Sequence, residues 1–159
     1  MSAPDAERPS SRSVAELEGL VVDPGAYELG SQAWLSRALV SPIAHLGAAD
    51  LRLLITHGRG LRHLVPAALD ALERAPFVAG DHGPGDLLIA VCLIDPDYWV
   101  AHVDEIARLR AVLDAADHAV SQLPERDQAH WREELELARE RIEHWHAVAL
   151  ITAQPPRDP

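Results

Sequence analysis

The stretch LRLLITHGRGLRHLVPAALDALERAPFVAGDHGPGDLLIAVCLIDPDYW, residues 51–99, decides the fold because it holds most of the apolar side chains that can form a core. Its middle part carries apolar residues in steps of three and four, at Leu61, Leu64, Val65, Ala68, Leu69 and Leu72. This spacing places one apolar stripe along a helix. The apolar run at 51–55 predicts a shorter helix before it, ended by the glycines at 58 and 60, because glycine readily adopts the left-handed conformation past a last helical turn.

Prolines set the expected boundaries of these helices. Pro66 inside a helix would remove a hydrogen bond, so we place the start of the central helix near Leu64 or Val65 and treat 60–63 as a turn. Pro76 and the segment GDHGPG at 80–85 predict a corner, which is followed by an apolar helix over 86–94. Asp95 before Pro96 predicts an N-cap and a first helical residue, here of a single helix that runs to about residue 121.

The flanking segments also predict helices. Ser13 and Glu16 have the spacing of a capping box, and a further helix is expected from residue 31 to residue 41, before Pro42. After Pro124 the apolar positions alternate in steps of four and three, at Trp131, Leu135, Ala138, Ile142, Trp145 and Ala149. This seam predicts packing against the preceding antiparallel helix, with a dimeric coiled coil as the alternative.

Together these patterns predict an all-α protein, a compact single-domain bundle of about six helices that ends in a long C-terminal helical hairpin. The helical domain is expected over residues 13–152, and residues 1–12 and 153–159 are expected to be disordered because they are rich in serine, proline or charge. The residues assigned to the core are Leu51, Leu54, Leu61, Leu64, Leu69, Leu88 and Trp99.

The composition bounds the function. A formal net charge of −11 disfavours direct binding to nucleic acid, which depends on cationic side chains. It suits a basic protein partner, although solubility alone also explains an acidic surface. Cys92 is the only cysteine, so an intramolecular disulfide is excluded. No apolar run approaches the ~18 residues of a membrane span, and we expect a cytoplasmic protein without a membrane partner.

Motifs for catalysis and metal binding are weak. His144 and His146 lie two residues apart and point about 200° from each other on a helix. His130 and Glu134 have i, i+4 spacing, which is more typical of a solvated helix contact than of a zinc site. The 80–85 loop lacks the Lys-Ser/Thr of a nucleotide-binding loop. We therefore predict no enzyme, no catalytic residues, no metal and no cofactor.

Asp81 and Asp86 flank the 80–85 loop and could form an acid–base pair. The favoured role for Asp86 is a different one, at the start of the following helix, where a carboxylate accepts backbone N–H bonds.

Within residues 13–103 the chain carries a series of short motifs, namely DLRLLI at 50–55, GL at 60–61, LVP at 64–66, AL at 68–69, Leu72, GD at 80–81, PGDLL at 84–88 and YW at 98–99. In order and spacing this series resembles the immunity proteins of bacterial contact-dependent growth inhibition (CDI) systems. His82 and Gly83 depart from the pattern, since members often carry an aromatic residue there. Residues 104–152 are expected to form a helical extension of the family-like core.

The resemblance implies an antitoxin in the cytoplasm that binds and neutralises the C-terminal toxin domain of a surface-displayed effector, commonly a basic nuclease that acts on tRNA. We expect the antitoxin alone to be a monomer or weak dimer. We place the toxin-binding contacts at carboxylates beside the motif, namely Asp81, Asp95, Asp97 and Glu105, with helix capping as the competing role of each aspartate. The alternative function is a helical adaptor or dimerisation module that uses the 131–149 seam.

Overall fold

The computed structural model describes residues 11–26 and 28–153, and within them it contains eight α-helices, two short 3₁₀ helices and no strand. The α-helices are α1 (Val14–Glu18), α2 (Gly30–Val40), α3 (Ala48–Thr56), α4 (Leu61–Arg74), α5 (Asp86–Cys92), α6 (Pro96–Ala101), α7 (Val103–Ala119) and α8 (Glu125–Thr152). The 3₁₀ helices are η2 (Ile43–His45) and η3 (Val120–Gln122). The predicted all-α class is confirmed, with eight α-helices where about six were expected.

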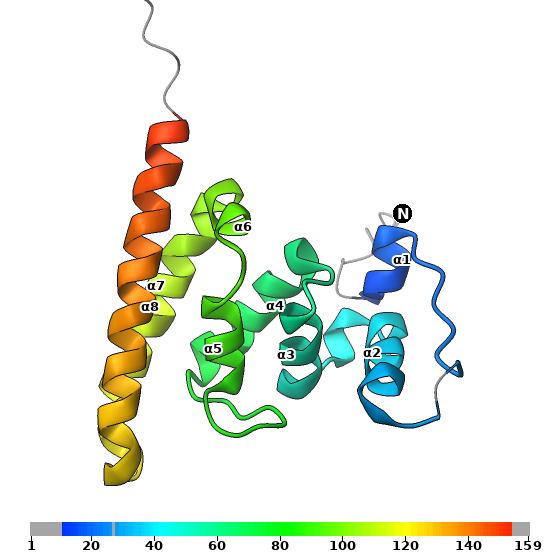
Figure 1. The fold of residues 1–159 in the computed structure, drawn as a ribbon, viewed down its shortest axis with the longest axis horizontal. Coiled ribbons are helices and arrows are strands. Elements are labelled where there is room, and N and C mark those ends of the chain that lie inside the picture. Colours follow the sequence, from blue (N-terminus) through cyan, green and yellow to red (C-terminus); the bar gives the residue numbers. More distant parts are fainter. Residues whose placement is uncertain (1–10, 27, 154–159) are drawn as a thin grey trace, which may run out of the picture.

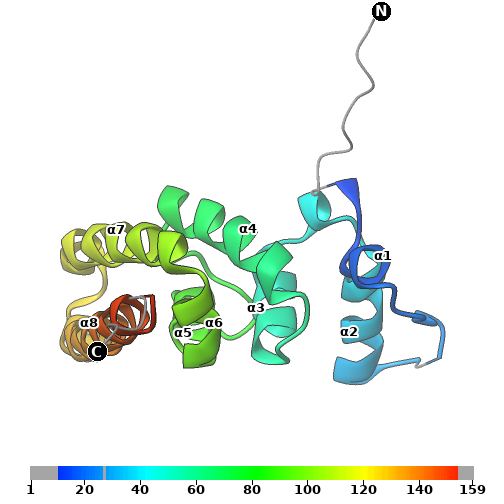
Figure 2. The same cartoon turned by 90° about the horizontal axis from the view of Figure 1, so that it is seen from above.

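The helices follow one another along the long axis in nearly chain order, from α1 and α2 at one end to α7 and α8 at the other (Figure 1). Seen from above, α4 and α7 lie in one layer, and α2, α3, α5 and α8 lie in the other (Figure 2). Helix α3 packs against α4 and α5, α4 packs against α7, and α8 packs against α6 and α7. The core therefore lies between the two layers and extends along the whole molecule.

The core assigned from the sequence is nearly all buried. Leu51, Leu54, Leu64, Leu69, Leu88 and Trp99 are each at most 3% exposed. The exception is Leu61, which is only partly buried and packs against the edge of this core at the first residue of α4. Leu61 lines a cleft together with His57 and Leu93, which leaves it partly open to solvent.

The predicted helix ends are confirmed at three places. Ser13 and Glu16 form a complete capping box on α1, and Gly19 ends that helix with φ of 64°. Helix α2 ends at Val40, one residue before the Ser41-Pro42 pair. Asp95 caps α6 by accepting a hydrogen bond from the Asp97 backbone N–H at 2.9 Å.

The predicted start of the central helix is wrong by three or four residues. Helix α4 begins at Leu61, and Pro66 lies inside it, in the second turn. The backbone N–H groups of His63 and Leu64 both donate to the Gly60 carbonyl, so the first turn is already helical. The bond that Pro66 cannot donate would end on the carbonyl of Arg62, an exposed residue, and the buried stripe on both sides of the proline outweighs its loss.

The expected single helix from Asp95 to about residue 121 is also wrong, because the chain breaks at His102 into α6 and α7. His102 has φ of −126° and ψ of 54°, and its ring Nδ1 lies 2.8 Å from the carbonyl oxygen of Tyr98. A carbonyl can only accept, so the ring N–H donates and takes the place of the backbone donor of a continuing helix. The break lets α6 pack on α8 while α7 packs on α4.

The seam of α8 is buried within the chain. Trp131, Leu135, Ala138, Ile142, Trp145 and Ala149 are all buried. Trp145 stacks on Trp99 of α6, with ring centroids 6.2 Å apart. The predicted packing of the last helix on its neighbour is confirmed, and the seam is not an open surface.

The predicted disordered ends fall mostly on residues 1–10 and 154–159, which lie outside the described residues. Arg12 is held within the described part, because its carbonyl accepts a hydrogen bond from the Ile43 N–H at 3.0 Å. Ala153 caps α8 with its backbone N–H. None of the helices in the described part of the chain has the length and apolarity needed to cross a membrane.

Trp131 lies directly beneath the loop that joins α4 to α5. Gly85, at the end of this loop, has φ of +81°, and a Cβ built on it would lie 2.2 Å from Cη2 of Trp131. Phe77 meets the same indole edge-on, with centroids 4.8 Å apart. Position 85 therefore requires glycine both for its backbone conformation and for the close approach of the indole.

Gly85→Ala should destabilise the protein by about 2–4 kcal/mol, the sum of left-handed strain and a clash with a buried indole. Gly58→Ala is the matched control, because Gly58 has φ of +64° but nothing within 4 Å of an added Cβ, so that it should cost only about 1–2 kcal/mol. Urea denaturation followed by circular dichroism measures both. Equal losses in the two variants would show that Trp131 does not restrict this position.

Candidate functional site

The loop between α4 and α5 is tied to α5 by one carboxylate. Asp86, the first residue of α5, accepts hydrogen bonds from the backbone N–H of Gly80 at 2.6 Å and of His82 at 2.9 Å. A Cβ on Gly80 would lie 2.7 Å from Asp86 Oδ2, so the loop can approach this closely only with glycine there. The expectation that Asp86 accepts backbone N–H bonds holds, but the donors come from the loop and not from its own helix.

Asp81 lies on the same loop and is held by Arg52 of α3. The guanidinium donates from Nε to Asp81 Oδ1 at 2.5 Å and from Nη2 to Oδ2 at 3.0 Å, which makes the ion pair bidentate. The hydrogen bonds from Arg52 are the main reason that the pKa of Asp81 lies below its ordinary value. Arg52 Nε also lies 3.7 Å from Asp86 Oδ2, so a single cation faces two carboxylates.

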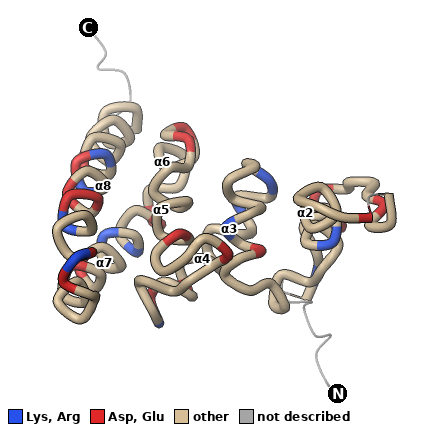
Figure 3. Tube along the Cα trace, turned by 60° about the horizontal axis from the view of Figure 1, so that its bottom comes forward, with Lys and Arg blue, Asp and Glu red and all other residues tan. Residues whose placement is uncertain are grey.

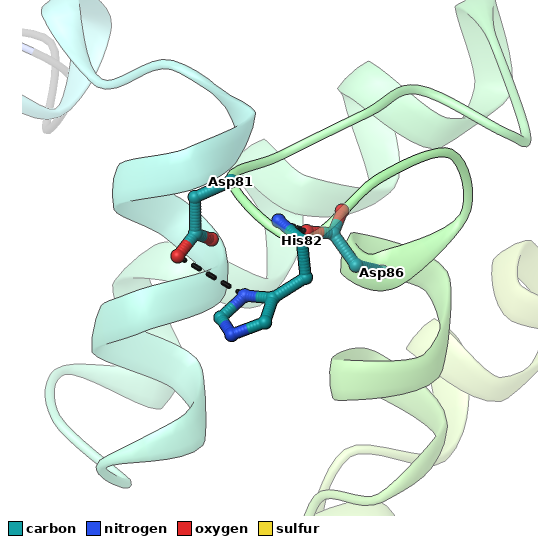
Figure 4. Close-up of side chains that lie close together, drawn as sticks. All are labelled: Asp81, His82 and Asp86. Atoms are coloured by element: carbon teal, nitrogen blue, oxygen red, sulfur yellow. Dashed lines mark hydrogen bonds and ion pairs between the residues drawn. The ribbon is translucent and has the colours of Figure 1, made fainter.

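The grouping of Asp81, His82 and Asp86 has the residue types of a metal site (Figure 4). One ligand atom from each lies within 4.8 Å of the others, and His82 Nδ1 is 3.0 Å from Asp81 Oδ2. Their carboxylates are already in use, by Arg52 on one side and by two backbone N–H groups on the other. The guanidinium supplies the positive charge that a metal would bring, so we assign the cluster a structural role in holding the loop.

Asp95 and Asp97 lie together at the corner between α5 and α6, and both are exposed. Asp95 uses Oδ1 as the cap of α6, and its side chain also lines a cleft beside α5. Because α5 has seven residues, it is roughly 10 Å long, so this corner and the Asp81 loop lie at opposite ends of one short helix.

Glu105 of α7 is engaged inside the chain. Its Oε2 accepts a hydrogen bond from the Tyr98 hydroxyl at 2.6 Å, across the break between α6 and α7. Burial and this contact raise the pKa of Tyr98, so the hydroxyl keeps its proton. The Tyr98 ring also stacks on His102, with centroids 4.1 Å apart. Of the four carboxylates predicted to contact the toxin, the structure thus brings Asp95 and Asp97 together and gives Asp81 and Glu105 partners within the chain.

Two clefts lie on either side of the C-terminal part of α5. The first, about 380 Å³, is lined by Arg52, Thr56, His82, Asp86, Leu93 and His130 among others. The second, about 410 Å³, is lined by Thr56, His57, Leu61, Ala90, Leu93 and Asp95 among others. Leu93 is the apolar residue that the sequence reasoning missed. The signal was present, because Leu87, Leu88, Val91 and Cys92 form the buried stripe of α5 and Leu93 falls outside it.

Many arginines on the outer helices are paired with carboxylates. Arg108 donates to Asp70 and Glu73, and Arg110 donates to Glu143. Acidic and basic positions also lie close to one another along α8 (Figure 3). Since the charges within such a pair cancel, the surplus of negative charge resides on carboxylates that are not paired with an arginine, such as those of Asp95 and Asp97 at the α5–α6 corner.

Cys92 is not a candidate nucleophile. It is 3% exposed, and burial raises the pKa of its thiol to about 12. A thiol at such a pKa carries almost no thiolate at neutral pH, so this cysteine serves as a small core residue.

Asp86→Asn should destabilise the protein by about 1–3 kcal/mol, because the amide nitrogen that replaces one oxygen would face a backbone N–H donor. We also expect faster hydrogen exchange at the Gly80 and His82 amides, measured by NMR. Asp97→Asn is the control, as Asp97 is exposed and close to the same helix. Unchanged exchange at Gly80 and His82 would mean that Asp86 does not hold the loop.

The comparisons with known proteins give one finding. A model of the family described as CDI immunity proteins matches residues 18–109, which is more than half of the chain. The match spans α2 to α6 and ends inside α7, so α8 lies outside it. Searches of curated proteins and of solved structures found no significant match. The chain therefore belongs to the family of CDI immunity proteins, as its motifs indicated.

Proposed function

We propose that this protein acts in the cytoplasm, where it binds the C-terminal toxin domain of the CDI effector encoded beside it and blocks that domain. The main observation that supports this proposal is the family match over residues 18–109. We further propose that the toxin domain is a basic nuclease that acts on tRNA, as the resemblance implies.

The charge of the chain supports this partner. A nuclease needs cationic side chains to hold phosphates, and this chain carries a net charge of −11. Carboxylates on an inhibitor can meet the same cationic groups, which speeds the encounter and covers the substrate groove. The pairing of Arg52, Arg108 and Arg110 with carboxylates strengthens this argument, because it limits the positive charge that would repel such a partner.

The alternative function, a helical adaptor or dimerisation module, is less well supported. It depends on the seam from Trp131 to Ala149, and that seam is buried against α6 and α7. A dimer through it would need α8 to leave the rest of the protein and expose the Trp99–Trp145 stack. Blocking by a preformed acidic surface needs no such opening.

Co-expression with the adjacent toxin domain should restore the growth of a host that the toxin domain alone kills. The purified pair should bind with a Kd on the order of 10⁻⁹ M or tighter, and the association rate should fall as salt screens the attraction. Calorimetry and stopped-flow kinetics measure these quantities. A toxin domain from an unrelated effector serves as the specificity control.

Continued killing in the presence of well-folded protein, or the lack of measurable binding, would overturn the proposal. Rescue with a toxin domain that leaves tRNA and other nucleic acids intact would keep the immunity function and remove the nuclease part.

A further inference from the structure

We infer that the toxin domain docks on the α5 face, which we define as Thr56, Ile89, Ala90 and Leu93 together with Asp86 and Asp95 at its two ends. The inference rests on the proposed function and adds the surface through which it is carried out. The docking surface of the toxin domain is then a protein surface with an apolar patch and cationic residues around it.

The α5 face is one continuous surface. The clefts of about 380 and 410 Å³ share three lining residues, Thr56, Ala90 and Leu93. The side chain of Leu93 therefore stands between the two hollows and borders both. A partner that fits over this ridge can fill both clefts at once, which is the shape complementarity that protein interfaces need.

Leu93 is the apolar centre of the face. Leu93 is 62% exposed. Its backbone is fixed, because its N–H donates hydrogen bonds to the carbonyls of Ile89 and Ala90. The partly buried Ile89 and Ala90 extend the apolar surface around it. Because its backbone is already fixed, only its side chain loses freedom on binding, and a partner that covers Leu93 removes its apolar surface from water.

Carboxylates lie at both ends of the face. Asp95 lines the second cleft, and Asp86 lines the first, with Asp81 beside it. Arg52 neutralises only part of this charge, because one guanidinium faces both Asp81 and Asp86. An apolar centre with an acidic rim fits a cationic protein better than nucleic acid or a second copy of this acidic chain.

The four carboxylates predicted to contact the toxin domain differ in their position relative to the α5 face. Asp95 belongs to it directly, and Asp81 and Asp97 flank it from the loop and from α6. Glu105 is bound to Tyr98 and lines neither cleft, so it is left out of the surface.

The first test places a charge at the centre of the face. Leu93→Arg should weaken binding to the adjacent toxin domain by roughly tenfold or more in Kd, measured by calorimetry. Leu150→Arg is the matched control, because Leu150 is 53% exposed on α8 and lines neither cleft. It should bind within about twofold of wild type. Circular dichroism and thermal melting check that both variants fold.

The second test asks for the sign of the partner's charge. Thr56 is exposed and borders both clefts, so Thr56→Arg and Thr56→Glu place opposite charges at one point of the face. Against a cationic partner, Thr56→Arg should slow association by roughly threefold or more at low salt, and Thr56→Glu should leave it unchanged or faster. Stopped-flow measurements at two salt concentrations separate the two effects.

The outcomes distinguish the surface from the function. If the wild type binds and Leu93→Arg and Thr56→Arg bind equally well, the α5 face is wrong while the immunity function stands. Equal loss in Leu93→Arg and Leu150→Arg would also overturn the face. A wild-type dimer in sedimentation that Leu93→Arg dissolves would assign the face to a second copy. No binding by the wild type contradicts the proposed function itself.

Discussion

The contact between Trp131 and Gly85 holds together parts of the chain that are far apart in sequence. The indole comes from α8, the glycine ends the loop before α5, and Phe77 meets the indole from the start of that loop. Without this contact the loop would depend on the hydrogen bonds of Asp86 and on the Arg52–Asp81 pair. The family match ends inside α7, yet the loop that it includes rests on a side chain from beyond it. The long last helix is thus part of the support of the matched region.

The acidic residues of this protein fall into two groups, those with partners inside the chain and those exposed to solvent. Asp86, Asp81 and Glu105 are engaged by backbone N–H groups, by a guanidinium and by a hydroxyl, and these contacts fix the loop and the α6–α7 break. Asp95 and Asp97 sit in the open, and only one oxygen of Asp95 is needed as a helix cap. A net charge says nothing of this division. It becomes visible only when each carboxylate is followed to its partner.

Local patterns predicted what local forces determine. The capping box at Ser13 and the cap at Asp95 depend on neighbours within one turn, and the seam of α8 could be identified from its own periodicity; all three are present. The errors lie where tertiary packing overrides a local preference. Pro66 stays inside α4 because the buried stripe continues across it, and the chain breaks at His102, where α6 turns to pack on α8 while α7 packs on α4.

The candidate surface could be predicted only in part for the same reason. The aspartates were proposed as contacts because Asp beside Pro or Gly is a recognisable corner, whereas Leu93 was overlooked within an apolar run although it falls outside the buried stripe of α5. Its φ of −98° and ψ of 2° suit almost any residue, so the helix end does not require leucine. Its exposure means that the core gains little from it. Exposure alone does not single out Leu93, because Leu29 and Ile151 are more exposed. Its position between two clefts that have a carboxylate at each end does, and this setting is what the inferred docking surface requires.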